Sequence, residues 1–447
     1  MIEQKKKRFK DTLQSAYDHK SYILFIRELL NDIHIVAPDT RIQTYDTFSV
    51  AVAHYYHIGN YVGDDKNKIA LFSVCLKNDK SLENARSMQR SFIKNLLEGS
   101  NCTGALVAFY NEQEPDKWRL SLVRLDYEFS NGKLSEKLTP AKRYSYLVGK
   151  DEPCHTALER LFPIFNDEKN PSLDELEEAF SVEAVTEDFF RKYREKYLEL
   201  KEYLDNNEEF IVESQSRGFD SEQFAKKLMG QIAFLYFIQK KGWLGVNAFP
   251  VKLTKRDYNL AFYRRGQKPK EILPIIYKQL EDGYYHRDSN ALLSLSAEDE
   301  SILSTIIKGD SWGSGPKDFV RRIFKGCIDA NKNFFDDYLE PLFYTGLNVD
   351  RGENAFYQPF HRRIPFLNGG LFEELDGYDW RHNDFKIPNE FFSNKEKKDR
   401  DADGLLDILE RYNFTMAEDE PMEREVAIDP EMLGKVFENL LDIKDRK

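Results

Sequence analysis

Residues 68–77 read Lys-Ile-Ala-Leu-Phe-Ser-Val-Cys-Leu-Lys, and this run decides the fold of the first part of the chain. It is apolar, has β-branched and aromatic members, and follows a turn-like segment at residues 63–67, a combination that favours a strand. Runs of similar character predict further strands at residues 48–57, 104–110 and 118–125. The strand at 68–77 is therefore expected to have neighbours in one sheet.

Helical patterns surround these strands. Residues 81–97 place apolar side chains near helical spacing between the second and third strands, and Ser81 can cap the first turn. Two more helical patterns, at 9–17 and 21–30, precede the strands. The order predicts a mixed α/β domain over residues 1–150, with its exit near residues 137–153.

Beyond residue 153 strand signals nearly vanish and helical patterns recur. They cover residues 224–241, 270–280, 302–307, 317–329 and 403–412. The expected fold class is α+β, an N-terminal α/β domain followed by a mostly α-helical region.

Charge divides the helical region. Residues 166–220 hold 17 acidic and 7 basic residues, a net charge of −10, whereas residues 221–280 hold 3 acidic and 12 basic residues, a net charge of +9. We therefore expect an acidic helical linker at 151–220 and a helical connector at 221–447.

Composition excludes several classes of protein. The chain has 447 residues and a formal net charge of −12, with 41% hydrophobic and 32% charged residues, which is typical of a folded, water-soluble protein. No apolar run approaches the roughly 20 residues that span a bilayer, and no apolar stretch follows the basic N-terminus as in a signal peptide. The four cysteines are scattered and form no CxxC pair, so a cytoplasmic protein with reduced thiols is expected.

One constellation in the N-terminal part could carry chemistry. Many metal-dependent nucleases place an acid at the start of one strand and an acid and a lysine two residues apart on the next, where carboxylates hold Mg²⁺ and activate water. Asp64 and Asp65 precede the strand at 68–77 and are the expected metal ligands, Lys77 ends it, and Gln89 follows on the helix. These four residues form the predicted catalytic set, although the two acids could equally belong to a solvated turn.

The position two residues before Lys77 is Cys75 rather than an acid. A thiol is a poor ligand for hard Mg²⁺. Either another acid substitutes for it, with Asp79 and Glu83 nearest in sequence, or the site does not cut DNA. His54 and His57 lie three residues apart on a predicted strand, so their side chains are expected on opposite faces and not as a metal pair.

Basic side chains suggest contacts with double-stranded DNA. Arg86 and Arg90 lie on the helix at 81–97, where phosphate contact and simple solvent exposure explain them equally well. The connector mixes basic and aromatic residues, a combination suited to phosphates and stacking. The predicted DNA-binding residues of the connector are Lys240, Lys241, Lys255, Arg256, Arg264 and Arg265.

Five strings resemble one protein family. They are SLENARSMQR at 81–90, LTPAKRYSYLVG at 138–149, QIAFLYFIQKKGWLG at 231–245, PFLNGGLFE at 365–373 and DPEMLGKVFENLL at 429–441. Together they resemble the N-terminal half of type IIG restriction-modification enzymes, which join a nuclease-like domain and an adenine-specific DNA methyltransferase in one polypeptide.

The resemblance implies a first domain of the PD-(D/E)xK restriction-endonuclease-like type, with Mg²⁺ as cofactor and foreign double-stranded DNA as substrate. The family's methyltransferase would follow residue 441, and its S-adenosylmethionine loop and Asn-Pro-Pro-aromatic motif do not occur in this sequence. No methyl transfer is therefore expected from this chain alone. Two hypotheses follow: the nuclease and connector portion of such an enzyme, or a non-catalytic DNA-binding scaffold for a separate methyltransferase or specificity polypeptide.

Overall fold

The chain divides into two compact units in the computed structural model. The described residues are 2–31, 33–36, 40–44, 47–77, 82, 85–125, 129–130, 133–134, 141–150, 152–167, 169–247, 310–352, 355–367, 369–395, 402–415, 422–432 and 434. The first unit joins Met1–Phe190 to Glu410–Leu433, and the second consists mainly of Arg191–Leu409. The sequence placed boundaries at residues 150 and 220, so the division seen in the structure differs from the predicted one.

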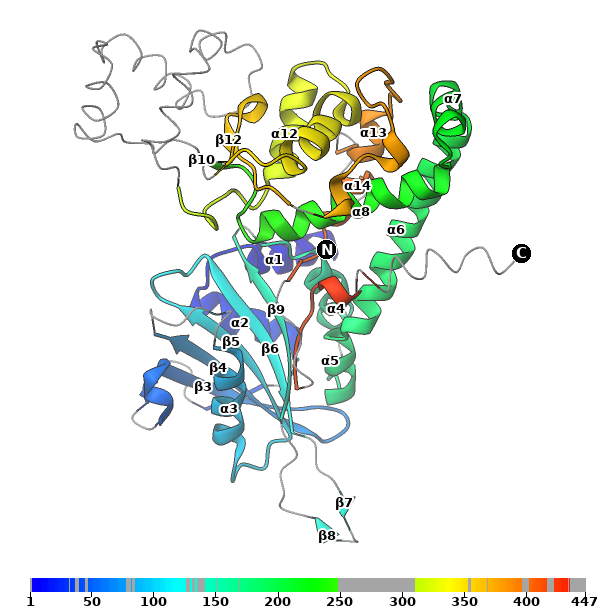
Figure 1. Ribbon diagram of the computed structural model, residues 1–447. Helices are drawn as coiled ribbons and strands as arrows, with labels where there is room; N and C mark the ends of the chain where they lie inside the picture. Colours follow the sequence, from blue (N-terminus) through cyan, green and yellow to red (C-terminus); the bar gives the residue numbers. More distant parts are fainter. Residues whose placement is uncertain are drawn as a thin grey trace, which may run out of the picture. The chain divides into compact units, whose positions relative to one another are not determined.

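A mixed β-sheet forms the centre of the first unit (Figure 1). In spatial order its strands are β1 (Ile33–Ile35), β3 (Val52–Val62), β4 (Lys68–Leu76), β5 (Gly104–Asn111), β6 (Lys117–Arg124), β9 (Lys142–Gly149) and β13 (Glu423–Glu425), and β2 (Ile42–Gln43) pairs with β3. The pairs β4–β5 and β9–β13 are parallel, and the other pairs are antiparallel. The strands expected at 68–77, 104–110 and 118–125 are confirmed, whereas the one expected at 48–57 begins only at Val52 and the expected exit contains a further strand, β9.

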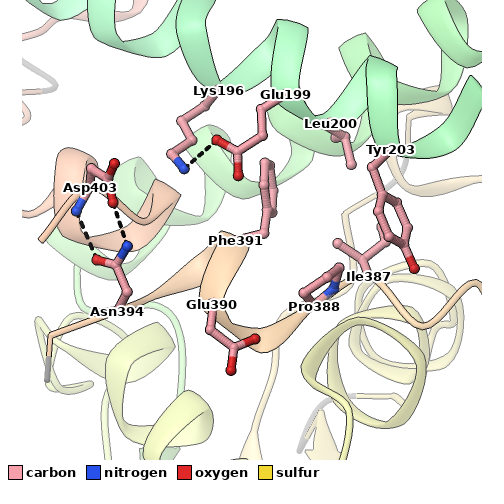
Figure 2. Close-up of a pocket in the computed structure, with 10 residues that line it drawn as sticks. All are labelled: Lys196, Glu199, Leu200, Tyr203, Ile387, Pro388, Glu390, Phe391, Asn394 and Asp403. Carbon is pink, nitrogen blue, oxygen red and sulfur yellow. Dashed lines mark hydrogen bonds and ion pairs between the residues drawn. The ribbon is translucent and has the colours of Figure 1, made fainter. Parts of the chain in front are cut away.

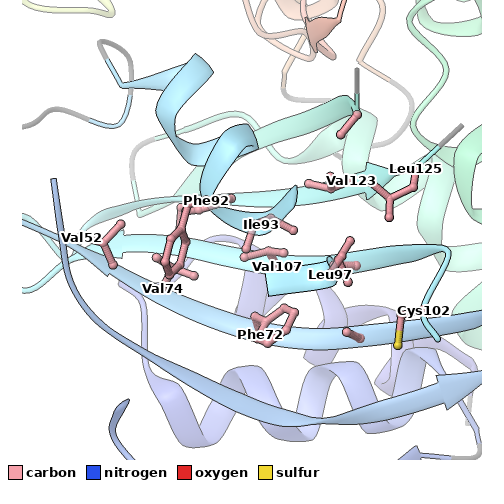
Figure 3. Close-up of a cluster of buried hydrophobic side chains, with 14 of the residues drawn as sticks. Val52, Phe72, Val74, Phe92, Ile93, Leu97, Cys102, Val107, Val123 and Leu125 are labelled. Atoms are coloured by element: carbon pink, nitrogen blue, oxygen red, sulfur yellow. The ribbon is translucent and has the colours of Figure 1, made fainter. Parts of the chain in front are cut away.

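Helices cover both faces of this sheet. On one face α3 (Arg86–Leu97) inserts Phe92, Ile93 and Leu97 against Phe72 and Val74, as Figure 3 shows. The opposite face is covered by α1 (Ile2–Leu13) and α2 (His19–Leu29), with α4 (His155–Asn166) packed against both helices (Figure 1). Since neighbouring residues on a strand point to opposite faces, Phe72 and Val74 face α3 and the intervening positions face α2.

An irregularity in β3 decides which side chains reach the α2 face. Val52 pairs with Leu76 and His54 with Cys75, so Ala53 is an extra residue in β3, a β-bulge. Without the bulge, His54 would pair one residue earlier and face α3. The bulge therefore turns His54 to the same face as Cys75.

The acidic segment after the sheet is helical, as predicted. It contains α5 (Leu173–Ala179), α6 (Val182–Asp205) and α7 (Glu208–Arg217). Ser172 caps the start of α5 in a capping box: the Ser172 side chain accepts a hydrogen bond from the Glu175 N–H, and the Glu175 carboxylate accepts one from the Ser172 N–H. Buried apolar residues line one side of these helices and the acidic residues lie mostly on their exposed sides.

The described part of the second unit is mostly helical. Its longest helix, α8 (Ser221–Lys240), is almost entirely buried, which agrees with the helix expected at 224–241. The other elements are β10 (Val246–Asn247), α12 (Phe319–Asp329), η2 (Phe335–Leu339), η3 (Leu342–Leu347), β11 (Phe356–Tyr357), η4 (Gln358–Phe360), β12 (Arg362–Arg363), η5 (Gly370–Phe372), η6 (Leu375–Gly377), α13 (Asn389–Phe392) and α14 (Leu405–Leu409). The first unit also contains η1 (Thr47–Val50) and a small hairpin, β7 (Phe129–Ser130) with β8 (Lys133–Leu134). Two helices expected at 270–280 and 302–307 lie outside the described residues.

The α+β class predicted from the sequence is confirmed. Among the described helices, none is both long and apolar enough to cross a membrane.

Candidate functional site

The turn between β3 and β4 holds the two acids that the sequence singled out. The Gly63 N–H donates to the Asn67 carbonyl, and Lys66 adopts a positive φ of 62°, as in a tight turn. The Asp65 carboxylate accepts from the Asn67 N–H at 3.0 Å and from the Leu173 N–H at 2.9 Å. Asp65 therefore fixes the turn and satisfies an N–H at the start of α5, while Asp64 is exposed.

Lys77 lies at the opposite end of β4 from this turn. The nine residues of β4 separate the two positions, which is about 26 Å at the usual rise of a strand. The expectation that Asp64 or Asp65 shares a metal ion with Lys77 is therefore wrong. The two acids close the hairpin, whereas Lys77 stands exposed at its open end.

The helix residues predicted for catalysis and phosphate contact take part in a buried network. Gln89 is fully buried, donates to the Leu82 carbonyl at 3.2 Å and accepts from the Arg143 guanidinium. Arg86 forms an ion pair with the buried Glu425 of β13. These contacts hold α3 on the face of the sheet opposite Cys75, and they occupy the amide of Gln89 in packing the helix. Arg90 is half-buried on the same helix.

The predicted DNA-binding residues of the connector are only partly described. Lys241 is exposed, and its ammonium lies 4.8 Å from the centre of the exposed Trp243 ring. Lys240 is half-buried at the end of α8. Four predicted residues, Lys255, Arg256, Arg264 and Arg265, lie outside the described residues.

Three metal-ligating residue types meet at the open end of the β3–β4 hairpin. His54 on β3, Cys75 on β4 and Glu112 just after β5 offer ligand atoms that all lie within 4.8 Å of one another. The antiparallel register pairs His54 with Cys75, and the parallel register pairs Cys75 with Tyr110, two residues before Glu112. We call His54, Cys75 and Glu112 the open-end cluster.

A second set of side chains surrounds the open-end cluster. One guanidinium nitrogen of Arg41 donates to His54 Nδ1 and to Glu112 Oε1, at 2.8 Å in each case. The other ring nitrogen, His54 Nε2, lies 3.2 Å from the Tyr110 hydroxyl and 3.6 Å from Glu112 Oε1. Tyr17 stacks on Tyr110 with ring centres 3.9 Å apart, so α2 and the segment before it cover the site from one side.

Burial sets the protonation of the cluster. Burial, with the nearby Arg41 charge, lowers the pKa of His54 to about 4, so the imidazole is neutral at physiological pH. Burial likewise raises the pKa of the Cys75 thiol to about 11. A neutral imidazole is the form that binds metals, and the protonated thiol is not a reactive nucleophile.

These donors do not fit Mg²⁺. Magnesium prefers oxygen ligands in octahedral geometry, and the open-end cluster offers one carboxylate, one imidazole and one thiol. The substitute acids nearest in sequence, Asp79 and Glu83, lie outside the described residues. No magnesium-dependent step is therefore assigned to this site.

The sequence analysis missed His54 and Glu112. It correctly placed His54 and His57 on opposite faces of a strand, because His57 pairs with Phe72 on the α3 face. Only the register across three strands brings His54 to Cys75 and Glu112, and the bulge at Ala53 sets that register. In the sequence, the spacing of Cys75 and Lys77 was the one feature that pointed to this end of the hairpin as a candidate site.

A separate cavity of about 250 Å³ lies in the second unit, between α6 and the region of α13 (Figure 2). Its lining includes Lys196, which is paired with Glu199 at 2.6 Å, and the reciprocally hydrogen-bonded Asn394 and Asp403. None of the predicted site residues lines this cavity. Lys196 and Asp403 are thus already paired within the lining, and the cavity gives no specific indication of a ligand.

Comparison with known proteins gives one significant relative. It is a protein of Methanocaldococcus jannaschii named "Putative type II restriction enzyme and methyltransferase RM.MjaORFECS2P", which is 38% identical to this chain over 141 residues. The match covers 30% of this chain and 11% of the length of that relative. No family model matches the chain, and no solved structure matches it significantly.

Proposed function

We propose that this chain is the nuclease-like and connector portion of a type IIG restriction-modification protein that acts on double-stranded DNA. The observation that carries the proposal is the 38% identity over 141 residues to a protein named as a restriction enzyme and methyltransferase. The five sequence strings quoted above support it. So does the strand order, in which an antiparallel hairpin is followed by a helical crossover to a parallel strand, with Cys75-x-Lys77 at the end of β4.

The donor set favours a second form of this proposal. With Cys75 where the nuclease pattern has an acid, and with Asp64 and Asp65 at the far end of β4, the cluster at this end of β4 offers a single carboxylate, Glu112, beside an imidazole and a thiol. In this second form the chain binds DNA without cutting it and supports a methyltransferase or specificity polypeptide. S-adenosylmethionine would then be bound by that methyltransferase and not by this chain.

DNA binding by the full chain tests the proposal common to both forms. We expect the purified protein to bind a labelled DNA duplex with an affinity that falls at least tenfold between about 50 and 200 mM salt, because basic side chains release counterions from phosphates. Fluorescence anisotropy measures this. Absence of duplex binding at about 50 mM salt would remove the proposed function.

Cleavage of plasmid DNA distinguishes the two forms. Nicking that requires Mg²⁺ and disappears in Lys77→Ala supports the nuclease form, and DNA binding without nicking supports the non-catalytic form. Lys68→Ala is the matched control, because Lys68 lies at the other end of the same strand. Equal nicking in Lys77→Ala and in the control would show that Lys77 takes no part in cleavage.

A further inference from the structure

The open-end cluster has the composition of a site for a borderline metal ion. Imidazole, thiolate and carboxylate are the ligands that Zn²⁺ and its neighbours in the transition series take, whereas Mg²⁺ takes oxygen ligands. His54 and Cys75 are each at most 2% exposed, and Glu112 reaches them from the solvent side. Three protein ligands leave one tetrahedral position open.

Two of these side chains, His54 and Glu112, already contact one positively charged group, the guanidinium of Arg41. His54 Nδ1 and Glu112 Oε1 accept hydrogen bonds from the same guanidinium nitrogen of Arg41. The position of that nitrogen is therefore one that both His54 Nδ1 and Glu112 Oε1 face. The Arg41 side chain is 46% exposed, so it can turn into solvent and yield this position without disturbing the core.

The opposite nitrogen of His54 has a suitable partner for such a site. A metal at Nδ1 requires the imidazole proton at Nε2, and Nε2 lies 3.2 Å from the Tyr110 hydroxyl, which can accept that proton in a hydrogen bond. Metal-binding histidines usually have a partner of this kind, which fixes the ring and its tautomer. Tyr17, stacked on Tyr110, holds the hydroxyl in place.

We infer that His54, Cys75 and Glu112 bind one divalent cation of the Zn²⁺ class, with the Arg41 side chain displaced. On binding, the Cys75 thiol gives its proton to solvent and the sulfur becomes the ligand. The site lies on the α2 face of the sheet at the ends of β4 and β5. It goes beyond the proposed function, because binding of the ion requires no DNA.

Metal titration of the full chain tests this inference. The protein, freed of metal by a chelator, is titrated with Zn²⁺ against a competing chromophoric chelator, and with Co²⁺ while its absorption spectrum is recorded. We expect one tight equivalent and a thiolate-to-cobalt charge-transfer band. Both should be lost in Cys75→Ser, with a fall in Zn²⁺ affinity of more than about 100-fold, since even partners of metal ligands are worth about 10–100-fold.

The matched control is Cys102→Ser. Cys102 is buried to a similar degree, but it lies in the segment before β5, at the turn end of the hairpin. This variant should keep the tight equivalent and the cobalt band. His54→Gln gives a second, independent loss if Cys75→Ser folds poorly, and circular dichroism checks each fold. Equal affinity in wild type, Cys75→Ser and His54→Gln, or no tight equivalent in the wild type, would overturn the inference.

Discussion

The two ends of the β3–β4 hairpin contain similar numbers of metal-ligating side chains but differ in what those side chains contact. At the turn end, the Asp65 carboxylate accepts hydrogen bonds from backbone N–H groups, which fixes the turn and the start of α5. At the open end, His54, Cys75 and Glu112 come from three strands and converge within 4.8 Å. Asp65, an acid that the sequence singled out, thus serves structure, and the residues that can serve chemistry are brought together by strand register.

The largest expected effect is a change of metal preference at the open end. Cys75→Asp replaces the sulfur ligand with oxygen, so the ratio of Zn²⁺ to Mn²⁺ affinity should fall about 100-fold, or about 2.7 kcal/mol. Metal-dependent shifts of the melting temperature report both affinities. Cys102→Asp buries the same carboxylate away from the cluster and should keep the wild-type ratio of Zn²⁺ to Mn²⁺ affinity. An unchanged ratio in Cys75→Asp would mean that Cys75 is not a ligand.

The next effect concerns Gln89, on the opposite face of the sheet. Gln89→Ala removes a buried hydrogen-bonding side chain between the Leu82 carbonyl and Arg143, which should lower the free energy of unfolding by about 2 kcal/mol. Urea denaturation measures the loss, and the exposed Gln14→Ala should change stability by less than about 0.5 kcal/mol. Zn²⁺ affinity should be the same in both variants. A stable Gln89→Ala protein with altered metal binding would instead place Gln89 at the site.

A smaller effect is expected from Arg41. Arg41→Gln removes the side chain that competes for His54 Nδ1 and Glu112 Oε1, so Zn²⁺ affinity should rise about tenfold, or about 1.4 kcal/mol. The chelator titration measures the change. Arg90→Gln, on the α3 face of the sheet, is the charge-matched control and should leave the affinity unaltered. A Zn²⁺ affinity lower in Arg41→Gln than in wild type would show that Arg41 supports the cluster and does not compete with the metal.

The smallest effect lies at the turn end. Asp65→Asn should lower the free energy of unfolding by about 1 kcal/mol at neutral pH, and Asp64→Asn by less than about 0.5 kcal/mol. Partial burial raises the pKa of Asp65, but hydrogen bonds from Asn67 and Leu173 outweigh it and hold the pKa below its ordinary value of 3.8. Folding therefore favours the charged form, and its contribution is lost as the pH falls through this lowered pKa.

Denaturation at several pH values checks the sign of this effect. The difference in stability between wild type and Asp65→Asn should be constant above about pH 5 and shrink below the ordinary pKa of 3.8. A difference that grows as the pH falls would contradict the role given to Asp65. Neither Asp64→Asn nor Asp65→Asn should change Zn²⁺ affinity, and this distinguishes the turn end from the open end.

Much of the fold could be predicted from the sequence. The apolar runs predicted at 68–77 and 104–110 and the helical spacing at 224–241 correspond to β4, β5 and α8, because each pattern matches the period of its element. The strand β13 could not be predicted in this way. Its three residues pair with β9 from 280 positions further along the chain, and so short a segment has no period of its own.

The site was harder to predict than the fold. Because Asp64 and Asp65 directly precede the strand that ends at Lys77, the sequence favoured a site shared by all three residues. The length of β4, however, separates the two acids from Lys77. The bulge at Ala53, which turns His54 toward Cys75, has no signature in a single sequence. Glu112 joins them only through the parallel register of β4 and β5. The unusual Cys75 before Lys77 was visible, and it lies at the end of the hairpin where His54 and Glu112 join it.

The most direct measurement of the account is X-ray absorption at the zinc edge on the full chain loaded with one equivalent of Zn²⁺. If the open end of the hairpin is the functional end, the spectrum should contain one sulfur neighbour at about 2.3 Å together with nitrogen and oxygen neighbours at about 2.0–2.1 Å. The sulfur neighbour should be absent in Cys75→Ser and present in Cys102→Ser. A spectrum with oxygen and nitrogen neighbours alone, unchanged in Cys75→Ser, would contradict the account.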